Sequence, residues 1–158
     1  MKKMLIGAAA GAAATVPMTI VMETLHERLP GEPARPLPPR EITEGVVAKA
    51  GLQGEVREGE KQVLTLAGHF GYGAVCGALF GLMAPRTPGA AVAAGAAFGL
   101  SVWVGSYLGW LPSVGVRHDA REDPPARNGL MIAAHVVYGA ATGALTAAAL
   151  PADDLDKD

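Results

Sequence analysis

The stretch LMIAAHVVYGAATGALTAAAL, residues 130–150, decides the fold, because it runs for the length of a membrane crossing without one charged side chain. Three other stretches share this property: residues 4–22, 63–84 and 89–111. Each is close to the ~20 residues that a helix needs to cross the hydrocarbon core, and none has the charged face of a helix in a soluble protein. Their length and their content of alanine and glycine exclude strands. The sequence therefore predicts an all-α fold, an integral membrane four-helix bundle formed by a single domain, residues 1–150.

The composition narrows the class of protein further. Half of the residues are hydrophobic and the formal net charge is −2, so the chain lacks the basic surface of a nucleic-acid-binding protein. Mean hydropathy is only +0.26, because alanine and glycine rather than leucine fill the apolar stretches. The single cysteine, Cys76, cannot form an internal disulfide and is interpreted as a small buried apolar residue.

The first apolar stretch permits a second interpretation. Met1, Lys2 and Lys3 followed by apolar residues also resemble a signal peptide. The run is long for such a segment, and no clean cleavage site with small residues precedes the charged region. We therefore favour a membrane span.

The connections between the stretches carry most of the charge. The long connection, residues 23–62, contains a proline-rich part, 30–39, that we expect to be extended, and then a short amphipathic helix over 41–50. This helix is expected to lie on the membrane surface or against the bundle. A shorter charged loop covers residues 112–129. The acidic tail, 151–158, is expected to be disordered.

Two of the apolar stretches resemble each other. Residues 67–79 and 133–145 align without gaps and share the pattern A-x-H-x-x-Y-G-A-x-x-G-A-L, which includes two residue types that are rare in this chain, histidine and tyrosine. We therefore predict two related helical hairpins, with His69 and His135 at equal depth on helices that run in the same direction.

Glycines recur at intervals of four residues along the same helices, and they are Gly73, Gly77, Gly81, Gly139 and Gly143. Small residues at this spacing let two helices approach closely, so we predict helix packing as their role. A groove for a flat ligand or a lipid is the alternative. The first and third stretches carry a weaker glycine match, Gly7-x-x-x-Gly11 with Gly95-x-x-x-Gly99.

Five segments resemble a known family. They are ATVPMT at 14–19, LPPREIT at 37–43, AGHFGYG at 67–73, SYLGWLP at 106–112 and RNGLMIAAH at 127–135. Together they resemble the YagU-like group of bacterial inner-membrane proteins, a domain family of unknown function. The resemblance implies the bacterial inner membrane as the location, and it supplies no catalytic residues.

An even number of spans places both termini on one side of the membrane and the loops 23–62 and 112–129 on the other. Most of the 13 lysines and arginines lie on the loop side, which the positive-inside rule makes cytoplasmic. Lys2 and Lys3, before the first span, favour the opposite orientation. All four histidines lie on the loop side in either case: His26, His69, His118 and His135.

Ionisable groups inside membrane spans are costly and therefore usually face the interior of a bundle. We predict that His69 and His135 face a shared polar pocket with Glu23 or His26 near its mouth. The candidates for this polar site are His69, His135, Tyr72, Tyr138, Glu23 and His26. Further candidates on the loop side are Arg40, Glu41, Arg127 and Asn128, interpreted mainly as interface anchors or loop pairs.

Three interpretations of the two span histidines stay open. They pin helices together through hydrogen bonds, they handle a proton or a small solute, or they bind haem or a transition metal. Glu23 and His26 form a Glu-x-x-His pair on one helical face, as in di-iron bundles, but the chain has only one such pair. We predict no cofactor; haem or a metal, with ligands from His69, His135, Glu23 and His26, is the alternative.

No catalytic motif is present: neither a dinucleotide-binding fingerprint nor a Ser-His-Asp arrangement is visible. The sequence therefore favours a non-enzymatic membrane protein that binds or passes a small species, or that stabilises a membrane assembly. Its partners would be the lipid bilayer and either a second copy of the chain or another membrane protein. The alternative is a redox or metal-dependent membrane enzyme.

Overall fold

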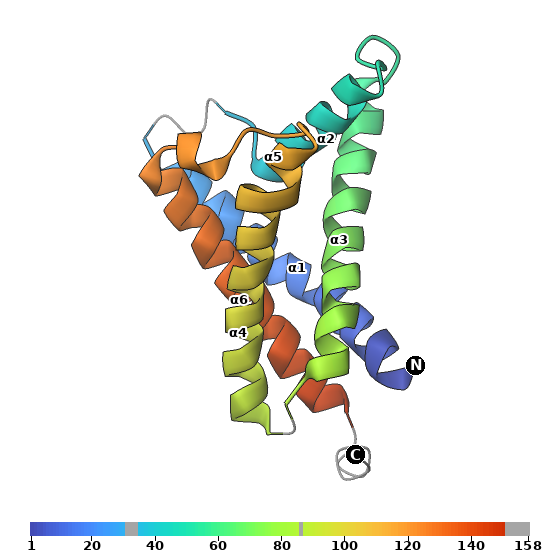
Figure 1. Cartoon of the computed structure of the whole chain (residues 1–158), viewed down its shortest axis with the longest axis vertical. Helices are drawn as coiled ribbons and strands as arrows, with labels where there is room; N and C mark the ends of the chain where they lie inside the picture. The colour runs from blue at the N-terminus through green and yellow to red at the C-terminus, as the bar shows by residue number, and fades with distance from the viewer. Residues whose placement is uncertain (31–34, 86, 151–158) are drawn as a thin grey trace.

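The computed structural model describes residues 1–30, 35–85 and 87–150, and Figure 1 shows their arrangement. The predicted disordered tail, 151–158, lies outside the described residues. Four long helices form the bundle, and they are α1 (Lys2–Arg28), α3 (Glu58–Met83), α4 (Pro88–Gly105) and α6 (Pro125–Ala149). The predicted all-α bundle of four long apolar helices, with a short helix in the first loop, is confirmed.

The short helix α2 (Pro38–Lys49) begins earlier than the sequence indicated. Pro38 and Pro39, which we expected to be extended, form its first turn. The first N–H groups of a helix have no partner within the helix, so a proline loses nothing there and its fixed φ suits the turn. The carbonyl of Leu37 then accepts from the backbone N–H groups of Arg40 and Glu41, 2.9 and 3.1 Å away.

The helices pack in two close pairs, α1 with α3 and α4 with α6, and α1 also packs on α6. Glycine makes both pairs possible. A Cβ atom on Gly11 would collide with the backbone of Gly73 and Gly77, and one on Gly95 would collide with that of Gly139 and Gly143. In the alignment of residues 67–79 with 133–145, Gly73 corresponds to Gly139, so Gly11 and Gly95 make equivalent contacts. The weak match in the sequence, which aligns Gly7 with Gly95, is therefore displaced by one helical turn.

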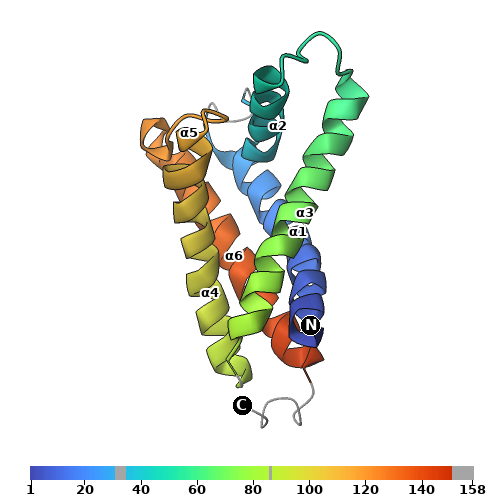
Figure 2. The ribbon, with the colours of Figure 1, turned by 45° about the vertical axis from the view of Figure 1, so that its right-hand side comes forward.

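Both ends of the bundle are visible in Figures 1 and 2. The start of α1, the end of α6 and the turn between α3 and α4 lie at one end, whereas α2 lies at the opposite end. There it is accompanied by α5 (Leu111–Ser113), with the short η3 (Ala120–Glu122) in the loop that follows. The start of α1 and the end of α6 thus lie at the same end of the bundle, as expected for an even number of spans.

The outer surface of the bundle is apolar along the helices. Large side chains project outward from α1 and α3, among them Ile20, 57% exposed, Val63, 65% exposed, and Val75, 60% exposed. Each of the four long helical segments is long and apolar enough to cross a membrane. Soluble monomers rarely expose an apolar surface of this extent to water, whereas the acyl chains of a bilayer can cover it. The chain is a multi-pass membrane protein in contact with the bilayer.

Helix α3 stands apart from α4 and α6. It packs closely on α1 but makes few contacts with the other two long helices. The two pairs therefore contact each other through α1 and α6, and α3 and α4 are left apart at the end that α2 covers. The candidate site lies there.

Candidate functional site: a cavity beneath helix α2

A cavity of about 250 Å³ lies between α1, α3, α6 and the end of α4, and α2 contributes to its wall at the charged end of the bundle. Its wall is mostly apolar. Of the described residues that line it, none is an aspartate, glutamate, lysine or arginine. The polar side chains of the wall are His69, His135, Tyr72, Tyr107, Tyr138, Ser106, Thr15, Thr43, Thr65 and Trp110.

A π-helical turn, η2 (Ser106–Trp110), shapes the α4 side of the cavity. Pro112 has no N–H to offer the carbonyl of Leu108, and Gly109 tolerates a backbone conformation outside the helical region, φ −115° and ψ −105°. The N–H of Leu111 therefore bonds to the carbonyl of Ser106, five residues earlier. This wider turn carries Ser106, Tyr107 and Trp110 into the wall.

His135 enters the cavity from α6 and is almost fully buried, with 5% of its surface exposed. Its Nδ1 lies 2.7 Å from the carbonyl oxygen of Met131, which can only accept. Nδ1 must therefore carry a hydrogen and donate it. The edge of the ring meets Tyr107 with the centroids 5.7 Å apart and the planes at 85°. In the neutral imidazole, Nε2 is left as an acceptor.

His69 enters from α3, on the other side of the cavity. Its Nε2 lies 3.2 Å from the hydroxyl oxygen of Thr19, on α1. The Thr19 hydroxyl has a single hydrogen, which it donates to the carbonyl of Thr15 at 2.8 Å. His69 Nε2 is therefore the donor, and in the neutral ring Nδ1 is the acceptor. The structure thus brings His69 and His135 to one cavity, each with one ring nitrogen bound to α1 or α6.

Tyr72 and Tyr138 occupy matching positions in the sequence but bond differently. Tyr138 is buried, and its hydroxyl donates to the carbonyl of Gly73 at 2.6 Å, which links α6 to α3. The hydroxyl of Tyr72 lies 2.8 Å from that of Ser106 and accepts from the Trp110 indole N–H at 3.4 Å. Tyr72 therefore bridges the space between α3 and η2.

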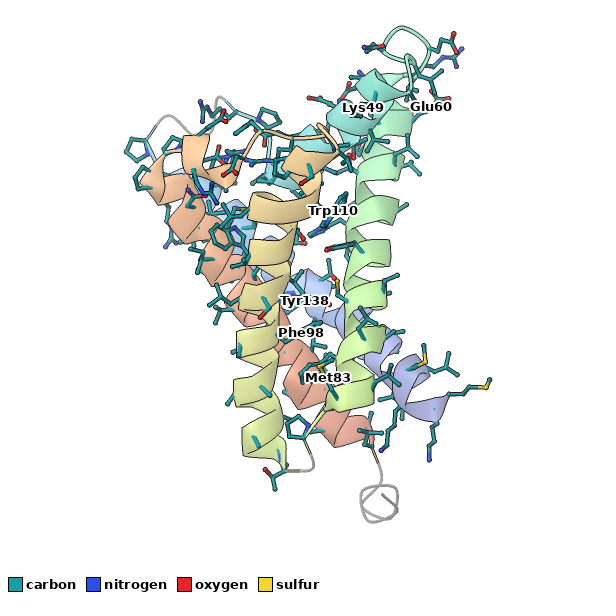
Figure 3. All side chains as sticks on the ribbon, in the orientation of Figure 1. Lys49, Glu60, Met83, Phe98, Trp110 and Tyr138 are labelled. Carbon is teal, nitrogen blue, oxygen red and sulfur yellow. The ribbon has the colours of Figure 1, made fainter. Side chains whose placement is uncertain are left out.

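This bridge lies on the outside of the bundle. Figure 3 shows Trp110 between α4 and α3, with Lys49 and Glu60 beyond it at the charged end and Met83 at the far end. Tyr72 and Trp110 are 41% and 45% exposed, so lipid reaches both rings. The cavity wall at this place consists of two side chains rather than of packed helices.

Glu23 and His26 are not brought into the cavity: they lie in the last turns of α1, outside its lining. The nearest α1 residues in the wall are Thr15 and Met18, further from the charged end. The place expected for Glu23 and His26 is filled by α2, whose Thr43 accepts a hydrogen bond of 2.9 Å from Thr65 of α3.

A buried ionic cluster holds α2 in this place. Glu41 of α2 accepts from Arg117 at 3.1 Å and from Arg127 at 2.8 Å. Asp123 accepts from Arg117 at 2.6 Å and lies 2.9 Å from Nε2 of His118. Arg127 has only 1% of its side chain exposed, so its charge depends on these partners. We call Glu41, Arg117, His118, Asp123 and Arg127 the ionic cluster.

The electrostatics of the cluster favour its charged form. Burial alone would raise the pKa of the Asp123 carboxyl, but the hydrogen bonds from His118 and Arg117 outweigh burial and hold that pKa below its ordinary value. The Arg117 guanidinium also lies over the Tyr107 ring, 5.0 Å from its centroid. The cluster is thus in direct contact with a wall residue of the cavity.

The other loop-side candidates have separate partners. Arg40 pairs with Glu44 at 2.7 Å and with Glu58 at 2.6 Å, which ties α2 to the start of α3. Asn128 donates to the carbonyl of Ala120 at 2.7 Å. Each of these residues therefore takes part in a contact between segments rather than with its neighbour in the sequence.

The comparison with protein families gives one match. A family described as a protein of unknown function (DUF1440) matches residues 28–143. The chain belongs to this family. The matched segment includes α2, α3, η2 and the α6 residues of the cavity wall, as well as the whole ionic cluster. No curated protein and no solved structure matches the chain.

Proposed function

We propose that the chain binds an uncharged, lipid-soluble small molecule in the cavity beneath α2. The observation that carries this proposal is the character of the wall, which is mainly apolar, includes two imidazoles and several hydroxyls, and has no charged side chain among the described residues. Ligand sites commonly combine apolar walls with a few convergent polar groups. A volume of about 250 Å³ suits a small molecule or one end of a longer one.

The ionic cluster supports an uncharged ligand. Its two guanidinium groups, on Arg117 and Arg127, are matched by two carboxylates, on Glu41 and Asp123. No excess charge is left to attract an ion into the cavity. Transfer of an ionised ligand from water into this apolar wall would carry a desolvation cost that no partner offsets.

The route of entry follows from the side-chain bridge. Tyr72 and Trp110 separate the cavity from the surrounding lipid, and side chains exchange rotamers far more readily than helices move. An uncharged molecule dissolved in the bilayer would enter between α3 and η2 when these two rings swing apart. This activity is non-enzymatic, because binding and release need no chemical step.

The setting is proposed from the sequence. Resemblance to the YagU-like group favours the bacterial inner membrane, with the loops 23–62 and 112–129 in the cytoplasm. The contacts of Gly11 with Gly73, and of Gly95 with Gly139, support an internal repeat of two hairpins. Association with a second copy or with another membrane protein would place the same cavity in a larger assembly.

Haem or metal binding is the second candidate, because His69 and His135 both line the cavity and each neutral ring keeps one acceptor nitrogen. The described residues contain no group of three or more His, Cys, Asp or Glu side chains that could hold a metal ion. Haem would also require the walls to move apart. A Soret band or a stoichiometric metal in the purified protein, lost in the His69→Ala, His135→Ala double variant, would establish this candidate instead.

Tryptophan fluorescence tests the proposed function, because the chain has two tryptophans and only Trp110 lines the cavity. The Trp103→Phe variant reports on the cavity, and Trp110→Phe, which keeps the buried Trp103, is the matched control. Bromine quenches an indole that it contacts. We expect saturable quenching of the reporter variant by para-bromophenol, and only linear quenching by charged para-bromobenzoate and para-bromobenzylammonium.

The contrary results are equally specific. Linear quenching by all three probes would show that they reach Trp110 only from the lipid, and the proposal would fail. Saturable quenching by a charged probe alone would show a site for an ion rather than for an uncharged molecule.

A further inference from the structure

Several wall groups that could donate a hydrogen bond already donate to the protein. The hydroxyl of Thr15 donates to the carbonyl of Gly11 at 2.9 Å, and that of Thr43 donates to the carbonyl of Pro39 at 3.0 Å. Tyr138 donates to Gly73, as described above. A hydroxyl has one hydrogen and two lone pairs, so each of these groups retains only acceptor capacity toward a ligand.

Other wall donors follow the same pattern, with the hydroxyl of Tyr107 as the exception. Thr65 gives its hydrogen to Thr43 or to the carbonyl of Lys61, at 2.9 and 2.7 Å. The indole N–H of Trp110 points to the Tyr72 hydroxyl. Tyr72 and Ser106 share one hydrogen bond, so this pair keeps one hydroxyl hydrogen to spare.

The two histidines extend the pattern, because each already donates one ring N–H to the protein. His135 donates its Nδ1 hydrogen to the carbonyl of Met131, and His69 donates its Nε2 hydrogen to the hydroxyl of Thr19. Within the described part of the chain, neither His135 Nε2 nor His69 Nδ1 has a hydrogen-bond partner. An sp² nitrogen is a good acceptor, and one that faces a mostly apolar cavity without a protein partner can accept a hydrogen bond from a ligand.

We propose that the ligand carries a hydroxyl group that donates to His69 or His135, so that the cavity selects alcohols and phenols over ketones, ethers and esters of the same shape. This inference rests on the proposed function and adds the chemical class of the ligand. An ether places a lone pair against a lone pair, whereas a hydroxyl satisfies the imidazole. A lipid-soluble molecule with a hydroxyl head and an apolar body would place the body between α3 and η2.

A matched pair of probes tests this selectivity in the full-length Trp103→Phe variant. Para-bromophenol and para-bromoanisole have the same bromine, the same ring and nearly the same shape, but only the phenol donates a hydrogen bond. We expect the phenol to bind about tenfold more tightly after correction for partition into the lipid, since one well-placed hydrogen bond contributes up to about that factor. The partition of each probe into protein-free lipid vesicles gives the correction.

The histidine variants locate the effect. His69→Leu with His135→Phe removes both acceptors and keeps a ring beside Tyr107, so the preference for the phenol should fall to about onefold. If this variant does not fold, the comparison of the two probes on the parent protein still decides the inference.

Each failure has a distinct meaning. Equal, saturable binding of phenol and anisole would overturn the hydroxyl selectivity and leave the proposed binding function in place. Absence of saturable quenching by either probe would overturn the proposed function itself. A preference for the phenol that survives in the double histidine variant would assign recognition to another acceptor of the wall, such as the hydroxyl oxygen of Thr15 or Tyr138, and would refute the role of the histidines.

Discussion

Removal of the Arg127 guanidinium should release α2 from the bundle. Arg127 is 1% exposed and donates both to Glu41 at 2.8 Å and to the carbonyl of Pro36 at 2.8 Å. In Arg127→Gln the buried carboxylate of Asp123 and the carbonyl of Pro36 lose a cationic neighbour. Loss of one partner from a buried ion pair typically costs about 3–5 kcal/mol.

The expected loss lies at the lower end of that range. Glu41 is 21% exposed and keeps Arg117 as a partner, so part of its charge stays compensated. We predict that the free energy of unfolding falls by about 3 kcal/mol. The measurement is an SDS titration in mixed micelles at neutral pH, followed by circular dichroism, together with hydrogen exchange of the α2 amides, which should speed up more than those of α3.

Arg40→Gln is the matched control, because Arg40 lies on the same helix as Glu41 but pairs with exposed carboxylates. Surface pairs contribute little to stability, so the unfolding midpoint should stay near that of the parent protein. An equal effect of the two variants would refute the argument that the buried cluster, rather than α2 charge in general, holds the cavity wall together.

Three further outcomes follow from the structure. The pKa of Asp123 is held below its ordinary value in the folded protein, so its contribution to stability is present at neutral pH and is lost as the pH falls through that depressed pKa. The difference in stability between the parent protein and Asp123→Asn, measured by thermal unfolding, should therefore shrink on acidification. A difference that widens would contradict this. Gly95→Leu should prevent close packing of α4 on α6, so that size-exclusion chromatography no longer shows a monodisperse protein. Gly105→Leu should behave like the parent protein, because a side chain at position 105 would extend into open space. Identical profiles for the two variants would argue against the close helix contact. Cys76→Phe should fill the cavity and remove saturable quenching by para-bromophenol while the circular dichroism spectrum stays unchanged; quenching that persists would place the probe elsewhere.

Hydropathy alone was sufficient to predict the helices. An uncharged run of about 20 residues has one stable conformation in a bilayer, because only a helix satisfies every backbone group within the segment. The short helix α2 was also predictable, from Ile42, Val46 and Val47 on one side of a polar segment, although its proline start was not. Each of these signals is local in the sequence.

The wall of the cavity depends on contacts that no local pattern reveals. Glu41 and Arg127 are 86 residues apart in the chain, yet their ion pair joins α2, which lines the cavity, to α6. The spacing of Glu23 and His26 correctly shows that they share a helical face, but it does not show which way that face turns. The π-helical turn that places Ser106 had a signal, Gly109 followed by Pro112, which indicates an irregular helix and not its function.

The position of a bound bromine atom shows directly whether the cavity beneath α2 binds a small molecule. Anomalous diffraction from crystals of the full chain grown with para-bromophenol would locate that atom without reference to the rest of the electron density. Binding in the cavity predicts a single strong peak beside Trp110, with the phenol oxygen within hydrogen-bond distance of His69 Nδ1 or His135 Nε2. Bromine peaks confined to the lipid-facing surfaces of α1 and α3, with the cavity wall closed around no ligand, would contradict it.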